Sequence, residues 1–64
     1  MLYDFLFELT EFSKNEGELI LCEEENAVAA YHTLIDKYGF LPEEIRFIER
    51  VSVEVGEMLG YDTY

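Results

Sequence analysis

The stretch from residue 2 to residue 12 alternates between two kinds of side chain, and this pattern limits what the chain can fold into. Every second position from residue 3 to residue 9 is large and apolar: Tyr3, Phe5, Phe7 and Leu9. The positions between and after them carry Asp4, Leu6, Glu8, Thr10 and Phe12. A period of two residues predicts a half-buried β-strand over residues 2–12. Such a strand needs partners, so the chain must build a sheet.

A second strand is predicted close behind the first. Residues 13–17, Ser-Lys-Asn-Glu-Gly, are typical of a turn, because Asn and Gly adopt positive φ easily. Residues 18–23 follow, with four apolar side chains in succession: Leu19, Ile20, Leu21 and Cys22. We therefore expect residues 2–12 and 18–23 to pair as an antiparallel hairpin with a loop of about five residues.

The next segment, residues 27–38, has the spacing of an amphipathic helix. Its apolar residues recur every three or four positions: Ala27, Ala30, Tyr31, Leu34 and Tyr38, with Val28 and Ile35 broadening the stripe. Asn26 is a favourable N-cap residue. Gly39 can take the left-handed conformation that ends a helix, Phe40 can pack back onto the last turn, and Pro42 prevents continuation.

Residues 45–55 allow two interpretations. Pro42-Glu43-Glu44 could begin a second helix with Ile45, Ile48 and Val51 on one side. The strand interpretation is favoured because the β-branched content is high. In a strand, one face receives Ile45, Phe47, Val51, Val53 and Val55, interrupted by Glu49. The opposite face receives Arg46, Arg50, Ser52 and Glu54. Residues 57–64 are expected to form a short tail with one turn.

These elements predict a single α+β domain over residues 1–64. The order is strand, strand, helix, strand, which gives a three-stranded antiparallel sheet with one helix packed on it. The single Cys22 cannot form an internal disulfide, and one Cys with one His is too few for a zinc site. Small domains without such supports often depend on a partner chain, so we expect a homodimer. Its interface, or an apolar pocket, would use the apolar residues left over: Leu6, Phe12, Ile20, Ile35 and Ile48.

The chain carries fifteen acidic and four basic residues, for a formal net charge of −11. This charge argues against direct binding to nucleic acid or anionic membranes, since both need basic patches. No apolar run is long enough to span a bilayer. The start of the sequence lacks the basic leader of a signal peptide. A cytoplasmic location is therefore expected, which in a phage protein would be the host cytoplasm.

We expect no enzymatic activity, cofactor or metal. His32 and Asp36 are four residues apart on the polar side of the helix, but no nucleophile motif accompanies them. Cys22 lies in an apolar strand, where a buried and inert thiol is the usual state. The carboxylates lack the spacing of a calcium loop, and no apolar pocket is indicated that could raise the pKa of one of them for acid–base work.

The acidic residues instead indicate a binding surface. Glu23, Glu24 and Glu25 precede the helix, where acids suit its positive end. A cap needs only one or two acids, and small domains carry net charges of about 2–8. One hypothesis is that this chain mimics DNA and occupies the basic cleft of a DNA-binding protein. The other is an interaction module whose acidity serves solubility alone.

The element order and the acidity, with Tyr38-Gly39 followed by Glu44-Ile45 before the last strand, resemble the small phage-encoded uracil-DNA glycosylase inhibitors. The resemblance implies a dimer whose helices form an apolar pocket for a leucine of the glycosylase, with acids imitating DNA phosphates. Tyr38 matches the helix-end tyrosine of that family. Leu34 stands where the family has an aromatic residue, and Leu19–Cys22 replaces a tyrosine-rich strand. Anti-CRISPR and anti-restriction proteins share the acidity and small size.

The resulting hypothesis is a dimeric, acidic inhibitor of a host DNA-binding enzyme, with uracil-DNA glycosylase as the first target. Its partner-binding surface is predicted to be an acidic rim around the helix beside an apolar site. The rim comprises Glu23, Glu24, Glu25, Asp36, Glu43 and Glu44. The apolar site comprises Tyr31, Leu34 and Tyr38.

Overall fold

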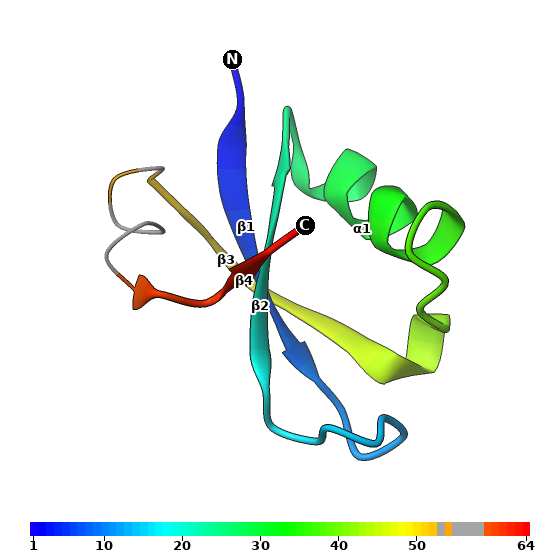
Figure 1. The fold of residues 1–64 in the computed structure, drawn as a ribbon. Coiled ribbons are helices and arrows are strands. Elements are labelled where there is room, and N and C mark those ends of the chain that lie inside the picture. The colour runs from blue at the N-terminus through cyan, green and yellow to red at the C-terminus, as the bar shows by residue number, and fades with distance from the viewer. Residues whose placement is uncertain (53, 55–58) are drawn as a thin grey trace.

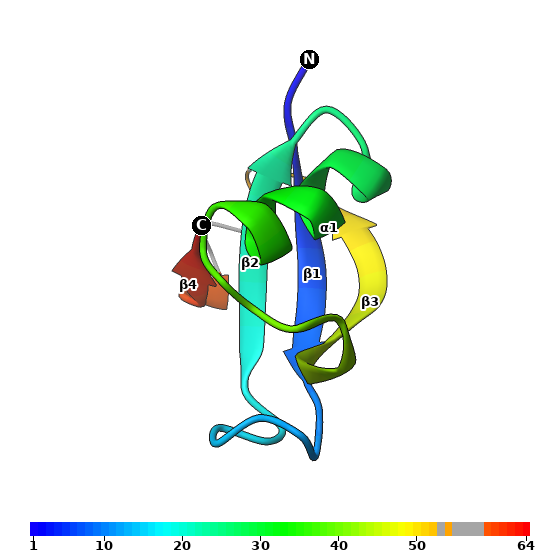
Figure 2. The same cartoon turned by 90° about the vertical axis from the view of Figure 1, so that its right-hand side faces the viewer.

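The computed structural model, which describes residues 1–52, 54 and 59–64, is an α+β fold with one helix on a four-stranded mixed sheet (Figure 1). Its elements are β1 (Tyr3–Leu9), β2 (Leu19–Glu24), α1 (Ala27–Asp36), the 3₁₀ helix η1 (Pro42–Glu44), β3 (Ile45–Val51) and β4 (Asp62–Thr63). The strand order is β3-β1-β2-β4, as Figure 2 shows. The predicted α+β class is confirmed, and the three-stranded antiparallel sheet is corrected to four strands. No helix of the described residues has the length and apolarity that a membrane span requires.

The fourth strand lies in the segment predicted to be a tail with one turn. β4 pairs with β2 in parallel, with Asp62 opposite Ile20 and Thr63 opposite Leu21. The Tyr64 N–H donates to the Leu21 carbonyl (2.7 Å), and the Glu23 N–H donates to the Tyr64 carbonyl (3.2 Å). Two residues are too few to show an alternating pattern, so the sequence contained no signal for this strand. Positions 57 and 58 of the predicted tail lie outside the described residues.

The β1–β2 hairpin forms as predicted, but β1 ends at Leu9 instead of Phe12. Leu9 closes the ladder, because its N–H donates to the Glu18 carbonyl (2.8 Å) and its carbonyl accepts from the Gly17 N–H (2.8 Å). Gly17 has φ 85°, a conformation that glycine adopts without strain. Beyond Leu9 the Thr10 side chain accepts from the Phe12 N–H (3.3 Å), which turns the chain away from the sheet.

The helix begins where the sequence predicted. The Asn26 side chain accepts a hydrogen bond from the Ala29 N–H (2.8 Å), so Asn26 is the N-cap. α1 ends at Asp36, two residues before the predicted boundary. Gly39 then takes φ 77°, and the Phe40 N–H donates to the Leu34 carbonyl (3.0 Å). The predicted glycine stop is therefore confirmed, with a slightly longer connection after the helix.

The third strand is confirmed from Ile45 to Val51, and Pro42 begins a single 3₁₀ turn instead of a second helix. The predicted placement of Ile45, Phe47 and Val51 on one face is wrong. Phe47 lies opposite Phe7 and Glu49 lies opposite Leu6, so Ile48 is an extra residue that forms a β-bulge. A one-residue shift moves later side chains to the other face. Positions 53 and 55 of the predicted strand lie outside the described residues.

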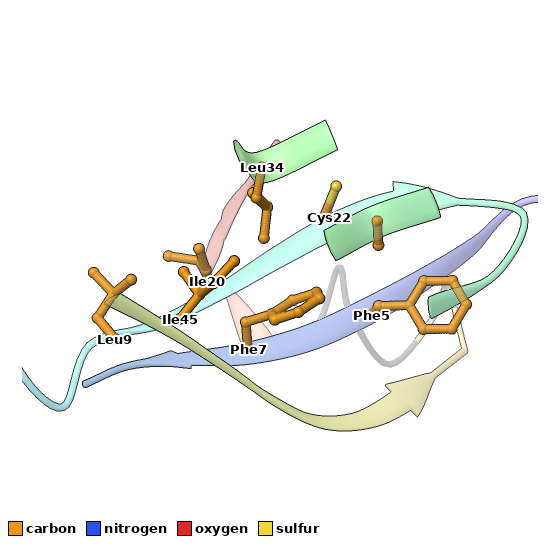
Figure 3. Close-up of a cluster of buried hydrophobic side chains, with 8 residues drawn as sticks. Phe5, Phe7, Leu9, Ile20, Cys22, Leu34 and Ile45 are labelled. Atoms are coloured by element: carbon orange, nitrogen blue, oxygen red, sulfur yellow. The ribbon is translucent and has the colours of Figure 1, made fainter. Parts of the chain in front are cut away.

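The main core lies between α1 and one face of the sheet (Figure 3). Its buried members come from all three long strands and the helix: Phe5, Phe7, Leu9, Ile20, Cys22, Ala30, Leu34 and Ile45. Each fully buried large apolar side chain contributes about 1.5–3 kcal/mol of transfer free energy. Ile20 is among them, so the expectation that it is left over for an interface is wrong.

The opposite face of the sheet is also buried at its centre. Leu6 lies opposite Leu21 in the β1–β2 ladder, and both side chains are buried. Residues 59–61 lie on this side of the sheet, away from α1 (Figure 1). Leu6 is therefore not a surplus apolar residue, whereas Phe12 and Ile48 are exposed. Ile35 packs partly against the main core.

Candidate acidic interface

The acids of the predicted rim fall into two groups at opposite ends of the sheet. Glu24 lies opposite Tyr3, the first residue of β1. Glu44 accepts at its backbone carbonyl from the Thr10 N–H (2.9 Å), just past the last residue of β1. A strand rises about 3.3 Å per residue, so the seven-residue β1 separates the two groups by roughly 20 Å. The predicted rim is therefore divided between the two ends of the sheet, with Asp36 at the last position of α1.

Two of these carboxylates have structural hydrogen bonds. The Thr33 hydroxyl of α1 donates to Glu24 Oε2 (2.8 Å), which connects the end of β2 to the helix. The Leu41 N–H donates to Glu44 Oε1 (3.1 Å), which caps η1. Both side chains are half-buried, whereas Glu23, Glu25 and Glu43 are exposed. Glu23 follows the pleat of β2 and faces away from Glu24.

The chain carries more carboxylates at the η1 end than the prediction assigned to it. The β1–β2 loop contributes three exposed acids, Glu11, Glu16 and Glu18. The Thr10 hydroxyl donates to the Glu43 carbonyl, so this loop adjoins η1. We call Glu11, Glu16, Glu18, Glu43 and Glu44 the loop-end cluster. Lys14 is the one basic residue within the loop. The sequence gives only an indirect signal for this cluster, because its two acidic segments come together only when β3 pairs with β1.

The basic residues leave most of the acidic charge without compensation. Arg46 forms an ion pair with Glu8 on the neighbouring strand. Arg50 lies over the Tyr3 ring (4.5 Å to the centroid), and Lys37 lies over the Tyr38 ring (5.3 Å). Even if each of the four basic residues neutralised one acid, eleven negative charges would remain. A field of this size attracts cationic surfaces at long range.

The predicted apolar site does not form on the surface. Leu34 is fully buried and points from α1 toward the sheet, so it belongs to the core (Figure 3). Tyr31 is half-buried and packs against the same core. Tyr38 lies beyond the helix end, is 41% exposed and contacts Tyr64 (4.9 Å between ring centroids). The apolar stripe is therefore the buried face of the helix, and the described residues form no pocket.

The remaining candidate residues are placed as follows. Asp36 is exposed at the last position of α1, and His32 is exposed on its outer side. Cys22 is a free, buried thiol, as predicted, and burial raises its pKa to about 11. Burial, followed by Asp62 and Glu18, also raises the pKa of Tyr64. Over the part of the chain that the structure describes, no three His, Cys, Asp or Glu side chains are grouped to hold a metal ion.

Comparison with known proteins adds no relative. No family model matches the chain, and neither the curated proteins nor the solved structures contain a match. The resemblance to the uracil-DNA glycosylase inhibitors therefore stays a prediction. The functional argument rests on the charges and their positions.

Proposed function

We propose that this chain inhibits a DNA-binding enzyme of a host cell by occupying its basic DNA-binding cleft. Uracil-DNA glycosylase is the first target to test. The observation that supports this proposal most directly is the loop-end cluster, in which the contact of Thr10 with Glu43 brings the acidic β1–β2 loop next to the acidic η1. The inhibitor would bind through this end of the molecule and compete with DNA.

The charge density supports mimicry of DNA. The longest dimension of the fold is 29 Å, and the net charge is −11, so one net negative charge falls in about 2.6 Å of length. Duplex DNA carries one negative charge per roughly 1.7 Å of its axis. The two densities are of the same order, and a cleft adapted to DNA would also accelerate association with this chain.

The loop-end cluster suits such a contact because most of its carboxylates have no structural task among the described contacts. Glu44 caps η1, whereas the side chains of Glu11, Glu16 and Glu43 are exposed at the end of the molecule. Replacing these three by glutamine removes three charges and leaves the Glu44 cap in place. This triple variant separates the proposed contact from the fold.

The direct test measures uracil excision from a uracil-containing duplex by glycosylase in the presence of increasing amounts of the chain. We expect inhibition that more DNA relieves and that weakens as salt rises, since exposed charges are screened within about 8 Å at physiological ionic strength. The E11Q/E16Q/E43Q variant should inhibit at least tenfold less well. Excision at the uninhibited rate at every concentration would eliminate this target.

A matched control carries the same charge change elsewhere. Glu25, Glu54 and Asp62 are exposed and lie outside the loop-end cluster, so the E25Q/E54Q/D62N variant also removes three negative charges. We expect it to lose no more than about threefold. Equal losses in the two triple variants would show that net charge acts without a specific contact at the loop-end cluster. No loss in either variant would favour an interaction module whose acidity serves solubility alone.

A pull-down from host lysate addresses the choice of enzyme. Capture of a nuclease or restriction complex, released by high salt and lost in the E11Q/E16Q/E43Q variant, would assign the chain to anti-CRISPR or anti-restriction inhibition. Capture of the glycosylase with the same sensitivity would support the first target. Binding that persists in the triple variant would contradict mimicry through the loop-end cluster.

A further inference from the structure

β3 is an edge strand with exposed apolar side chains. It pairs with β1 on one side, and within the described residues no strand pairs with its outer edge (Figure 2). Phe47 is 45% exposed and Ile48 is 41% exposed. Edge strands of this kind present unpaired backbone N–H and C=O groups, so they are templates for another strand. Natural proteins usually protect them with charges or cover them.

The charge of β3 differs from that of the rest of the molecule. Residues 45–51 contain two of the four basic residues, Arg46 and Arg50, and one acid, Glu49. This strand therefore has a charge of +1, and the remaining residues together have −12, which sums to the net −11. A second copy of this anionic chain meets the least repulsion when it approaches along β3.

The bulge at Ile48 places complementary charges on one face of the strand. Arg46 lies opposite Glu8, and Glu49 lies opposite Leu6. Glu8 and Leu6 both face away from α1, because alternate residues of β1 point to the main core. Arg46 and Glu49 therefore share that face, although three residues separate them in the sequence. In an unbulged strand they would lie on opposite faces.

We propose that two copies of this chain pair through β3 in an antiparallel arrangement, with the two-fold axis between the Phe47–Ile48 pairs. Arg46 then lies opposite Glu49 of the partner subunit, and Glu49 lies opposite Arg46 of the partner subunit. Phe47 lies opposite Ile48 of the partner subunit. The two sheets join into one, and each Arg46 has a carboxylate on both sides, its own Glu8 and the Glu49 of the partner subunit.

The outward backbone groups of β3 are compatible with this register. Leu9 directs its N–H and carbonyl to the β2 side, where they bond to Glu18 and Gly17. Because backbone groups alternate along an antiparallel ladder, Glu8 and Arg46 direct theirs at each other, and Phe47 directs its own outward. Ile48 is the extra residue of the bulge and lies directly opposite no residue of β1. Across the trans peptide bond, the outward Phe47 carbonyl turns the Ile48 N–H toward β1. Glu49 lies opposite Leu6, which has the same parity as Glu8, so the Glu49 N–H points to β1 and the Ile48 carbonyl points outward. Pairing Phe47 with Ile48 of the partner subunit therefore places the outward Phe47 N–H beside an outward Ile48 carbonyl.

Shifting the pairing by one residue in either direction is less favourable. One shift places Phe47 opposite Phe47 of the partner subunit and Arg46 opposite Ile48 of the partner subunit, so the charges are not matched. The other shift brings like charges together. Arg46 would then lie opposite Arg50 of the partner subunit, and Phe47 would lie opposite Glu49 of the partner subunit. Like charges directly opposite each other destabilise a sheet, and matched charges stabilise it. The side chains thus favour the proposed register, and the outward backbone groups of Phe47 are compatible with it.

Charge exchange between the two pairing positions tests this arrangement. The E49R variant places two arginines opposite each other across the interface, and the R46E variant places two glutamates there. Each variant alone should therefore weaken dimerisation at least tenfold in sedimentation equilibrium. An equimolar mixture restores opposite charges at both positions, so heterodimers should form with near wild-type affinity. Wild-type dimerisation should strengthen between 0.05 and 0.5 M NaCl, because salt screens the repulsion between two chains that each carry a net charge of −11.

Matched controls change the charge equally in the β1–β2 loop. K14E matches R46E and E16R matches E49R, and both positions are exposed. The controls should keep wild-type affinity within about threefold. Circular dichroism verifies that each variant is folded, and E49R keeps the Glu8–Arg46 ion pair intact. A wild-type chain that stays monomeric up to about 100 µM would overturn the proposal, as would a mixture that fails to form heterodimers.

Disulfide cross-linking between two engineered cysteines tests the register independently of the charge exchange. The R46C/E49C variant places cysteines at directly opposed positions, which should oxidise to a covalent dimer, whereas native Cys22 is buried and should not take part. The R46C/R50C variant fits only the shifted register and serves as the comparison. Preferential cross-linking of R46C/R50C would overturn the proposed register. These measurements need no target enzyme, so they are independent of the inhibition assays.

Discussion

β1 and β3 are both seven-residue strands rich in apolar side chains, yet one is the centre of the molecule and the other its edge. β1 is buried at five of its seven positions, on both faces of the sheet. β3 is buried at Ile45 alone. The difference comes from position, because β1 has a strand on each side and α1 over one face, whereas β3 has one neighbouring strand among the described residues. Similar patterns thus give a core strand and a binding edge.

The largest expected effect on stability comes from a comparison of two phenylalanines that lie opposite each other. Phe7 of β1 is fully buried, and Phe47 of β3 is 45% exposed, with 5.6 Å between the ring centroids. Removing a buried phenylalanine costs about 3–5 kcal/mol, so F7A should lose most of the stability of this small domain. F47A should cost about 1–2 kcal/mol, since half of its surface is already in water.

Urea denaturation at low protein concentration measures both losses. Low concentration keeps the chain monomeric, so the result reports the fold alone. Equal losses for F7A and F47A would show that β3 is as deeply packed as β1, and the distinction between a core strand and an edge strand would fail.

The local signals in the sequence predicted the elements well. Asn26, Gly17 and Gly39 act through their own side chains or backbone angles, so a cap and two positive-φ turns could be located without knowing the fold. The three long strands also followed from their apolar content. The predicted ends differed by two or three residues, because β1 stops at Leu9, just before the turn in which Thr10 accepts from the Phe12 N–H, and α1 stops at Asp36, before the Gly39 turn.

The features that the sequence missed all depend on distant contacts. An alternating pattern cannot show which strand is central, so Leu6 and Ile20 were expected at an interface although both are buried. Leu34 was expected at an apolar site, but a helical stripe has the same spacing whether it faces a core or a partner. The loop-end cluster depends on the contact of Thr10 with η1, more than thirty residues away.

A second test examines the buried ladder between β1 and β2. Cys22 lies opposite Phe5, and burial raises its thiol pKa to about 11. Between about pH 9 and pH 11 the thiol of the folded chain therefore keeps its proton while the thiol of the unfolded chain loses it. The contribution of the buried thiol to the free energy of unfolding is complete below about pH 9 and is lost as pH rises to about 11. Linkage predicts a loss of roughly 2 kcal/mol over this interval.

The C22A variant is the control for that experiment. It should be less stable at neutral pH because of the cavity, but its stability should fall less steeply between pH 9 and 11 than that of the wild type. Parallel curves for the two proteins, measured by urea denaturation, would show that the thiol is not protected by burial. An exposed cysteine at the β3 edge, I48C, should react with a thiol reagent at pH 8 far faster than Cys22.

The smallest expected effect concerns the ion pair that connects β1 to β3. The Arg46 side chain is 67% exposed and that of Glu8 is 32% exposed, so water and salt screen the attraction. A double-mutant cycle with R46Q and E8Q should give a coupling energy of about 0–1 kcal/mol at low salt, and almost none in 1 M NaCl. If the coupling instead exceeded about 2 kcal/mol and persisted in salt, the edge strand would be held by charge. A small value would mean that β3 is held by its ladder with β1 and by Ile45, which leaves Arg46 available to a second chain.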